Sequence, residues 1–293
     1  MQLIAILLQW GIIQASAVYM QEAPDYESAN VSQTAMGRVV EILDTDRYWT
    51  KIRTPEPYEG WINGLCLVKI TEEQKDEFLD SPRYICTAEF SHIYEKPSDR
   101  SPRVTDFVMG NIVGQGSRRS GAWVEVVLPS GKTGWARRHD VQDLRQWASG
   151  PAATASGLED VARRFVGSAY VWGGMSPKGF DCSGLAGFCY FMNGILLPRD
   201  ASQQAKCGVS VPVGEMLPGD LVFFGESRIS HVGLCVAPGV VVHSSQTVRV
   251  SSLLPGGEDY YGRNIIDVRR ILGHVDDGTG AKSILKSPLY FKQ

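Results

Sequence analysis

The stretch Phe180-Asp181-Cys182-Ser183-Gly184-Leu185 predicts the fold of the second half of the chain. Helical periodicity follows it, because apolar residues recur at three- and four-residue steps, at Leu185, Phe188, Cys189 and Met192. The short polar cluster before this stripe predicts a helix that begins near Cys182. A thiol in the first turn lies near free N–H groups and the positive end of the helix dipole, which favour the nucleophilic thiolate. Cys182 is therefore a candidate nucleophile, with a small buried core residue as the alternative for this stretch alone.

Two of the five histidines flank a predicted β-hairpin. Strand-like runs at 229–236 and 240–245 are joined by a Pro-Gly turn, which places His231 and His243 on antiparallel neighbours. Such residues lie about 4.5–8 Å apart at the backbone, directly or diagonally opposite. A nucleophilic cysteine needs a base, and a third polar group that fixes the orientation of that base. We expect His231 to pair with Cys182 and His243 to hold His231, although a strand histidine alone is also a common structural residue.

Length and composition describe a folded protein with more than one domain. The chain has 293 residues, 43% of them hydrophobic and 21% charged. A formal net charge of −3 without a dense Lys/Arg patch gives no indication of nucleic-acid binding. The six cysteines have wide, irregular spacings, unlike a disulfide scaffold. On one helix, Cys182 and Cys189 would be separated by roughly 10 Å along the axis, too far for a disulfide.

Residues 1–17 have the pattern of a signal peptide. They carry no charge, are apolar from Leu3 to Leu8, and end in Ala15-Ser16-Ala17, the small-x-small pattern of a cleavage site. The basic residues that usually begin such a peptide are missing, and a buried N-terminal strand or helix is the alternative. The pattern predicts export to the periplasm or cell envelope, with a cytoplasmic location as the alternative. The segment is too short and polar for a membrane span.

An internal repeat organises the first half of the chain. Trp49, Pro55, Gly60 and Trp61 recur after a shift of 74 residues as Trp123, Pro129, Gly134 and Trp135. Each copy has strand-like residues, a turn rich in Pro and Gly, and a Gly-Trp strand, which predicts two small β-barrels. One larger β-sandwich is the alternative. Between the copies, Thr71-Glu72-Glu73-Gln74 forms a capping box that predicts a short helix reaching Leu79.

The C-terminal segment has the order of an α+β domain. A capping box at Ser156 predicts a helix that Gly167 ends, and a turn at 197–204 leads into a short helix. Strands follow from Leu221 onward. The expected boundaries are a signal peptide at 1–17, a first barrel with its short helix at 18–80, a second barrel at 81–147, a linker at 148–155, and the α+β domain at 156–293.

The motifs together resemble a known family. Asp181-Cys182-Ser183-Gly184, His231-Val232-Gly233 and His243, with Tyr170-x-Trp172-Gly173-Gly174 upstream, look like the motifs of NlpC-type cysteine peptidases, a papain-like family of bacterial cell-wall metabolism. The repeat resembles the bacterial SH3-like domains attached to cell-wall enzymes. The resemblance implies a multidomain protein in which two all-β SH3-like barrels precede an α+β papain-like peptidase domain. Two barrels before such a domain are similar to the γ-D-glutamyl-L-diamino acid endopeptidases of the dipeptidyl-peptidase VI type. Those enzymes release L-Ala-γ-D-Glu from murein peptides with a free N-terminal alanine.

The resemblance also implies roles for individual residues. Tyr170 would lie beside Cys182 and contact the substrate or the oxyanion. The L-Ala-D-Glu portion would be bound by residues near the nucleophile and after the Leu-Pro-Arg turn, namely Asp181, Ser183 and Ser202. Glu22 and Tyr58 of the first barrel are candidates for a clamp on the terminal ammonium, a role that suits a partly desolvated carboxylate. The expected partner is a murein peptide, and no cofactor or metal is expected.

Three other functions stay open at this point. The protein could bind cell-wall peptides without catalysis, or transfer the acyl group to an amine or lipid from the same Cys/His site. A zinc hydrolase would use both cysteines of the predicted helix and both hairpin histidines, but the gap between the cysteines is unusual for zinc. The sequence does not decide between diaminopimelate and lysine as the diamino acid, nor does it give the physiological role or the oligomeric state.

Overall fold

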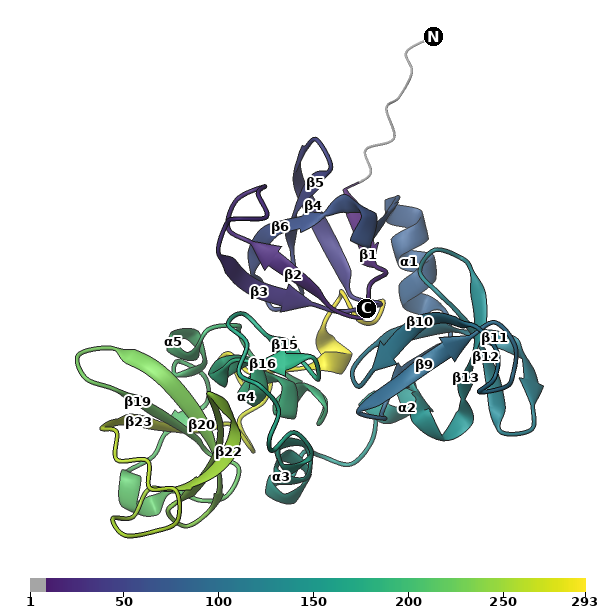
Figure 1. Cartoon of the computed structure of the whole chain (residues 1–293). Helices are drawn as coiled ribbons and strands as arrows, with labels where there is room; N and C mark the ends of the chain where they lie inside the picture. Colours follow the sequence, from purple (N-terminus) through teal and green to yellow (C-terminus); the bar gives the residue numbers. More distant parts are fainter. Residues whose placement is uncertain (1–8) are drawn as a thin grey trace. The chain divides into compact units, whose positions relative to one another are not determined.

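The computed structural model describes residues 9–293, which form two compact units (Figure 1). The first unit runs to Trp147 and also includes Ser287–Gln293, and the second is Ala148–Lys286. The predicted linker at 148–155 therefore lies at the boundary. The predicted C-terminal domain does not extend to residue 293, because the side chain of Tyr290 is buried in the first unit and its carbonyl accepts a hydrogen bond from Arg83 at 2.6 Å.

The first unit contains two seven-stranded sheets. The first copy consists of β1 (Trp10–Ile13), β2 (Val18–Gln21), β3 (Asn30–Thr34), β4 (Val39–Asp46), β5 (Trp49–Arg53), β6 (Glu59–Asn63), the 3-10 turn η1 (Gly64–Cys66) and β7 (Leu67–Ile70). The second copy consists of β8 (Arg83–Cys86), β9 (Phe90–Tyr94), β10 (Arg103–Val108), β11 (Ile112–Ser120), β12 (Trp123–Val127), β13 (Thr133–Arg137), η2 (Arg138–Asp140) and β14 (Val141–Asp143). The strand orders are β3-β2-β6-β5-β4-β1-β7 and β10-β9-β13-β12-β11-β8-β14, so corresponding strands take corresponding places. The internal repeat is therefore a repeat of topology, in two separate sheets.

Each copy has a glycine in its Gly-Trp strand against which a buried core side chain packs closely. Gly60 in β6 and Gly134 in β13 occupy equivalent positions of the two copies. A Cβ atom on Gly60 would lie 2.9 Å from the side chain of Met20, and one on Gly134 would lie 2.4 Å from the side chain of Ile93. Both Met20 and Ile93 are fully buried. The Gly-Trp motif thus leaves room for the core that each sheet encloses.

The first sheet begins earlier than the sequence predicts. β1 pairs with β4 on one side and with β7 on the other, and Ile12 and Ile13 are buried. Cleavage after Ala17 would remove this doubly paired strand, so the predicted boundary between residues 17 and 18 is wrong for the folded unit. The alternative, a buried N-terminal strand, describes residues 10–13. Residues 1–8 of the predicted signal peptide lie outside the described residues.

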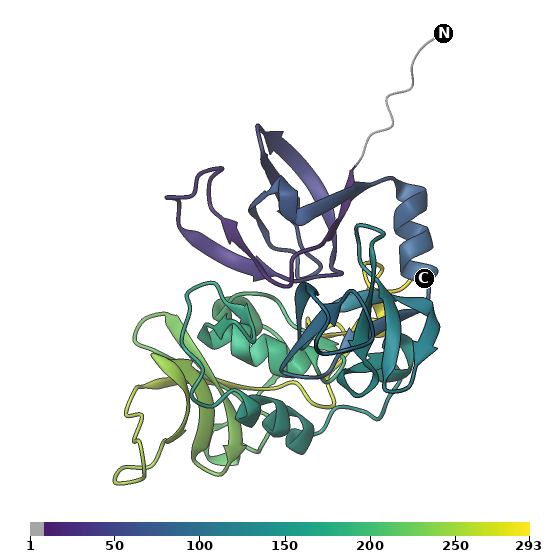
Figure 2. The ribbon, with the colours of Figure 1, turned by 45° about the vertical axis from the view of Figure 1, so that its right-hand side comes forward.

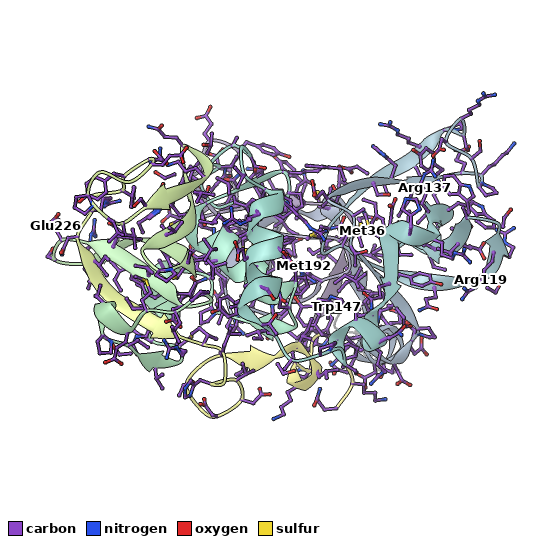
Figure 3. All side chains as sticks on the ribbon, turned by 90° about the horizontal axis from the view of Figure 1, so that it is seen from below. Met36, Arg119, Arg137, Trp147, Met192 and Glu226 are labelled. Atoms are coloured by element: carbon purple, nitrogen blue, oxygen red, sulfur yellow. The ribbon has the colours of Figure 1, made fainter. Side chains whose placement is uncertain are left out.

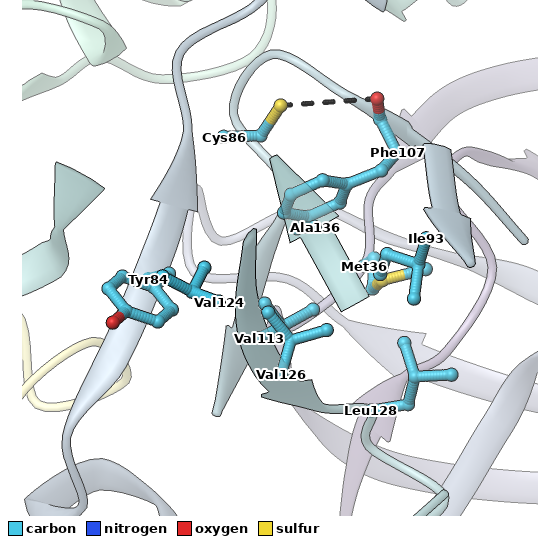
Figure 4. Close-up of a cluster of buried hydrophobic side chains, with 10 residues drawn as sticks. All are labelled: Met36, Tyr84, Cys86, Ile93, Phe107, Val113, Val124, Val126, Leu128 and Ala136. Atoms are coloured by element: carbon cyan, nitrogen blue, oxygen red, sulfur yellow. Dashed lines mark hydrogen bonds between the residues drawn. The ribbon is translucent and has the colours of Figure 1, made fainter. Parts of the chain in front are cut away.

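A methionine of the first copy completes the core of the second. Met36 lies in the turn between β3 and β4, and its side chain packs among the buried residues of the second sheet, including Ile93 and Val126 (Figure 4). The backbone supports this contact, since Ile112 N donates to Met36 O at 2.9 Å. A Cβ atom on the next residue, Gly37, would lie 2.1 Å from the carbonyl oxygen of Ile112. The two copies therefore fold as one unit.

The helix predicted between the copies is confirmed. It is α1 (Glu72–Asp80), in which Thr71 Oγ1 accepts from Gln74 N at 3.2 Å and Gln74 Oε1 accepts from Thr71 N at 3.0 Å. A further short helix, α2 (Leu144–Ala148), contains Trp147, the last residue of the first unit before the boundary, which is labelled in Figure 3. Within residues 9–293, none of the helices has both the length and the apolar character that a membrane crossing demands.

The second unit has helices first and a sheet afterwards. Its helices are α3 (Ala155–Arg164), α4 (Cys182–Phe191) and α5 (Ala201–Gln204). The six-stranded sheet has the order β18-β23-β19-β20-β21-β22, with β18 (Val209–Ser210), β19 (Leu221–Gly225), β20 (Ile229–Ala237), β21 (Val240–Ser245), β22 (Thr247–Ser252) and β23 (Ile265–Arg270). Smaller elements are β15 (Met175–Ser176), β16 (Gly179–Phe180), β17 (Ile195–Leu196), β24 (Lys282–Ser283), η3 (Val213–Glu215) and η4 (Ile284–Lys286). α4 packs against β20 and β21, as the turned view also shows (Figure 2). The predicted helix at Cys182 and the predicted hairpin are both present.

The first helix of this unit differs from its prediction at both ends. Its N-cap is Thr154, whose Oγ1 accepts from Gly157 N at 3.1 Å, and not Ser156. The helix ends at Arg164 and not near Gly167, so Val166 is exposed. The cap lies earlier because the hydroxyl of Thr154 reaches the amide of Gly157, three residues further on.

Candidate active site

Cys182 is the first residue of α4, and Asp181 caps that helix. Asp181 Oδ1 accepts from Gly184 N at 2.7 Å, which satisfies one of the free amides of the first turn. Behind it, the predicted apolar stripe is buried, with Leu185 and Cys189 almost inaccessible. Packing of this stripe fixes the axis of α4. All six cysteines of the chain are free thiols, and Cys182 and Cys66 are the two that keep some exposure.

A buried arginine ties Asp181 to the segments around it. Arg199 is 2% exposed and forms an ion pair with Asp181 through both carboxylate oxygens. It also donates to Ser183 Oγ at 2.9 Å, while Gly173 N donates to Asp181 Oδ2 at 3.0 Å. The side chains of Asp181 and Ser183 are thus engaged within the protein. This network holds the start of α4 against the loop at residue 173 and against the segment before α5.

Two glycines allow the loop and the helix to approach each other closely. A Cβ atom on Gly184 would lie 2.0 Å from the carbonyl oxygen of Gly174. That oxygen accepts a hydrogen bond from Asp181 N at 3.0 Å. The glycine of the Asp-Cys-Ser-Gly motif is therefore required by a backbone contact directly behind the nucleophile.

The two hairpin histidines are bonded to each other. His231 on β20 and His243 on β21 are buried, and His231 Nε2 lies 2.7 Å from His243 Nδ1. Leu234 pairs with Val242, so His231 is diagonal to His243 across the hairpin, as the sequence predicts. The bond to His243 leaves Nδ1 of His231 as the ring nitrogen for the thiol.

Two backbone amides donate hydrogen bonds to the sulfur of Cys182. The N–H of Val232, the residue after His231, donates to the sulfur of Cys182, as does the N–H of Ser183. These amides and the charge of Arg199 lower the pKa of the thiol, but burial is the larger influence, and the pKa of Cys182 is raised to about 11. The amides at the helix start therefore favour the thiolate, while burial of the sulfur opposes it.

Burial has the opposite effect on the imidazoles. It lowers the pKa of His231 to about 3, assisted by His243 and by the positive charges of Arg263 and Arg249. It also lowers the pKa of His243 to about 4, with Arg249 acting in the same direction and Asp259 against it. Burial thus disfavours a positive charge on either imidazole.

Tyr170 lies close enough to the nucleophile to sense its charge. Its amide donates to Gln246 O at 2.9 Å, which fixes the loop beside β22. Burial, and then the negative charges of Cys182 and Asp181, raise the pKa of Tyr170 to about 12. The raised pKa keeps the phenol of Tyr170 protonated at neutral pH.

Three other predicted residues are Ser202, which is in the second unit, and Glu22 and Tyr58, which are in the first. Ser202 is exposed on α5, three residues after Arg199. Glu22 is exposed directly after β2, and the half-buried Tyr58 directly precedes β6. Because Gln21 of β2 pairs with Trp61 of β6, Glu22 and Tyr58 lie at neighbouring strand ends of the first sheet. The second unit brings together the other predicted residues, Cys182, His231, His243, Tyr170, Asp181 and Ser183.

Three residues of the site are absent from the sequence predictions. Ser251 Oγ lies 2.9 Å from His243 Nε2 and donates to Asp259 Oδ2 at 2.7 Å. The ring of Tyr261 packs against both imidazoles, with centroids 4.3 Å from His243 and 5.4 Å from His231. These residues follow the last recognisable motif. The pairing of β21 with β22 places Ser251 beside His243, and Asp259 and Tyr261 lie in the segment after β22.

A part of each unit matches a known protein family. The NlpC/P60 family matches residues 167–270, and the bacterial SH3 domain matches residues 16–68. A γ-D-glutamyl-L-lysine dipeptidyl-peptidase of Bacillus cereus is 28% identical over 256 residues, which cover 82% of this chain and 75% of that protein. The dipeptidyl-peptidase 6 of Lysinibacillus sphaericus is 25% identical over 83% of this chain and 91% of its own length.

The crystal structure of an NlpC/P60 family protein from Bacillus cereus has the same fold. Its TM-score is 0.77 at 23% sequence identity, over 90% of this chain and 99% of that one. A third relative, the γ-D-glutamyl-L-lysine dipeptidyl-peptidase of Bacillus subtilis, is 41% identical over 40% of this chain and 41% of its own length.

Proposed function

The C-terminal unit of this chain belongs to the NlpC/P60 family of cysteine peptidases, and we propose that it hydrolyses the γ-D-glutamyl–L-diamino acid bond of murein peptides with a free N-terminal L-Ala. The relatives named for cleavage next to γ-D-glutamyl-L-lysine support this substrate class. The observation that carries the chemistry is the 2.7 Å bond between His231 Nε2 and His243 Nδ1, beside a thiol that accepts the amide of Val232. It provides a nucleophile, a base and a group that orients the base.

The proposed reaction passes through a thioester. As the sulfur of Cys182 attacks the γ-carbonyl carbon of D-Glu, Nδ1 of His231 takes the thiol proton. The C–N bond then breaks, and His231 returns the proton to the leaving amine of the diamino acid. Water, activated by His231, hydrolyses the thioester and restores the thiol, which releases L-Ala-γ-D-Glu. The amide of Cys182 and the protonated phenol of Tyr170 are the donors that we propose for the oxyanion.

Substrate recognition is proposed to involve both units. Ser183 and Ser202, with Asp181 behind them, would border the L-Ala-D-Glu portion. Glu22 and Tyr58 would bind the terminal ammonium of the peptide. We also propose that the second seven-stranded sheet is an SH3-like domain, because its strand order repeats that of the first.

The proposed site of action follows from the substrate. Murein peptides belong to the cell envelope, so we propose that the enzyme acts on the envelope or on fragments derived from it. The predicted cleavage after Ala17 does not support export, since it would remove β1.

Product analysis tests the proposed function. We expect the full chain to convert L-Ala-γ-D-Glu-L-Lys, its meso-diaminopimelate analogue, or both into L-Ala-γ-D-Glu, detected by mass spectrometry. Cys182→Ala should abolish cleavage, while Cys66→Ala, which removes the other partly exposed thiol, should retain it. Activity in Cys182→Ala would remove this sulfur from the mechanism, and retention of the peptides without cleavage by the wild type would indicate a binding protein.

A second pair of substrates tests the ammonium clamp. N-acetylation removes the charge of the terminal amine, so the acetylated tripeptides should be cleaved much more slowly. Glu22→Gln should lower the preference for the free amine. Equal cleavage of free and acetylated tripeptides would contradict the roles of Glu22 and Tyr58.

A further inference from the structure

A line of hydrogen bonds continues beyond the two catalytic histidines. His243 Nε2 lies 2.9 Å from Ser251 Oγ, and Ser251 Oγ lies 2.7 Å from Asp259 Oδ2. The register of β21 and β22 explains the first contact, because Val241 pairs with Ser251 and His243 therefore lies diagonally across from it. Ser251 is 1% exposed, so its hydroxyl meets these partners rather than bulk water.

The carboxylate of Asp259 determines which atom donates in each hydrogen bond of this line. An ionised carboxylate only accepts hydrogen bonds, so the hydroxyl of Ser251 donates its proton to Asp259. The oxygen of Ser251 must then accept from His243, which places the proton of that imidazole on Nε2. Nδ1 of His243 is left with a lone pair and accepts from Nε2–H of His231. Nδ1 of His231 consequently carries the lone pair that a base for Cys182 requires.

We propose that Ser251 and Asp259 are positioning residues that fix the tautomers of both catalytic histidines. Asp259 sets the direction, and Ser251 transmits it to His243. The base that faces Cys182 is thus held in its proton-accepting form by a carboxylate three hydrogen bonds away. This role rests on the proposed peptidase function and adds two residues to its machinery.

Without the carboxylate the direction is no longer fixed. A free Ser251 hydroxyl can rotate and donate to His243 Nε2, which moves the proton of that ring to Nδ1. His243 then donates to Nε2 of His231, and the proton of His231 moves to Nδ1, where it blocks acceptance of the thiol proton. Loss of Asp259 therefore leaves a fraction of the molecules in an inactive tautomer.

The charges around the histidines indicate that this line of hydrogen bonds also supports the positive charge that His231 acquires during the reaction. Arg249, opposite His243 in the register, and Arg263 both disfavour a positive charge on His231, as does His243. Asp259 is the acidic group that favours a charge on His243, and it also forms an ion pair with Arg249 at 3.3 Å. When His231 takes the proton of Cys182, every hydrogen bond in the line already points toward this carboxylate. Tyr261, packed against both rings, excludes water from one side.

The backbone of Asp259 has an uncommon conformation. Its φ is +46°, in the left-handed region that is uncommon for residues other than glycine. The side chain is 41% exposed. A substitution at this position therefore changes the hydrogen-bonded line while leaving the core intact.

Four variants of the full chain test the proposal. Ser251→Ala and Asp259→Ala break the line, while Ser251→Thr keeps the hydroxyl and Asp259→Asn keeps an oxygen that can accept. We expect kcat on the tripeptide to fall by about tenfold to a hundredfold in the two alanine variants, with KM little changed. Ser251→Thr should keep most of the activity that the alanine variants lose. Asp259→Asn should keep only part of it, because its amide can also donate and no longer fixes the direction of the hydrogen bonds. The matched controls are Ser210→Ala and Asp267→Ala, which break a similar serine–aspartate bond of 2.9 Å at the other edge of the same sheet.

A spectroscopic measurement separates this proposal from the proposed function. Nitrogen-15 chemical shifts of the imidazoles in the wild type should show both protons on Nε2, whether or not a tripeptide is cleaved. In Asp259→Ala the shifts should indicate a mixture of tautomers, and the pKa of His243 should fall because a favourable negative charge is lost.

Two results would overturn the proposal. One is a wild type with either imidazole protonated on Nδ1 at neutral pH. The other is a pair of alanine variants that keep kcat within about twofold of wild type while Cys182→Ala is inactive. If instead no tripeptide is cleaved although the tautomers are as expected, the proposed substrate is wrong and the role of the two residues stands.

Discussion

Replacement of Arg199 by methionine should destabilise the C-terminal unit strongly. Methionine keeps much of the length of the side chain but removes the charge, and the carboxylate of Asp181 then loses two of its hydrogen-bond donors. Both side chains are almost inaccessible, at 2% for Arg199 and 9% for Asp181. Removing one partner of a buried ion pair typically costs about 3–5 kcal/mol, because the other charge stays buried and uncompensated. For a unit of this size the melting temperature should fall by roughly 10 °C.

The assay is thermal and urea unfolding of the full chain, followed by a signal from the C-terminal unit. Arg163→Met is the matched control, since its ion pair with Glu159 lies on the surface of α3 and should contribute less than about 1 kcal/mol. The double variant Asp181→Asn/Arg199→Met should recover part of the loss, because no buried charge remains. An Arg199→Met variant as stable as Arg163→Met would refute the reasoning. Because Arg199 also lowers the pKa of Cys182, the single variant should be alkylated by iodoacetamide more slowly at neutral pH.

Two further predictions concern the same unit. Gly184→Ala places a Cβ atom 2.0 Å from Gly174 O, so the loop that contains Gly174 must move by about 1 Å or more. We expect kcat/KM to fall about a hundredfold. The control Gly214→Ala has open space around the new Cβ atom and should match the wild type. The folded-state pKa values of His231 and His243, about 3 and 4, lie below the ordinary value of 6.5, so the unfolded chain binds more protons at intermediate pH. The free energy of unfolding should therefore be highest above about pH 6.5 and should decrease as the pH falls toward 4. Equal urea midpoints of the C-terminal unit at pH 7 and pH 5 would contradict this prediction.

Local patterns were sufficient to predict the elements that carry the catalytic residues. The apolar stripe behind Cys182 defines α4, and the alternating residues around a Pro-Gly turn define the hairpin of β20 and β21. The repeat of Trp and Gly predicted two copies, and their identical strand order bears this out. These predictions succeed because each rests on contacts between residues close in sequence, or on the same pattern occurring twice.

The predictions that failed depend on contacts between distant residues. Nothing near residues 10–13 indicates that β4 and β7 pair with both sides of this strand, so the sequence predicts a later start of the first barrel, at residue 18. Tyr290 belongs to the first unit through its bond to Arg83, more than two hundred residues away. Ser251 is missed for the same reason, since strand pairing brings it to His243, and Asp259 meets Ser251 from the segment after β22.

The pKa of Cys182 shows why the position at a helix start was not enough to describe the nucleophile. The helix start supplies amides that favour a negative sulfur, but the packing that fixes α4 also buries the thiol, and burial raises its pKa to about 11. The same burial lowers the pKa of His231, so burial opposes the charged form of both groups. Formation of the charged pair must then be supported from both ends at once, by the amides of Val232 and Ser183 at the sulfur and by the hydrogen-bonded line from His231 to Asp259 at the imidazole. A buried cysteine peptidase of this kind therefore depends on the partners of its base as much as on the helix that carries its nucleophile.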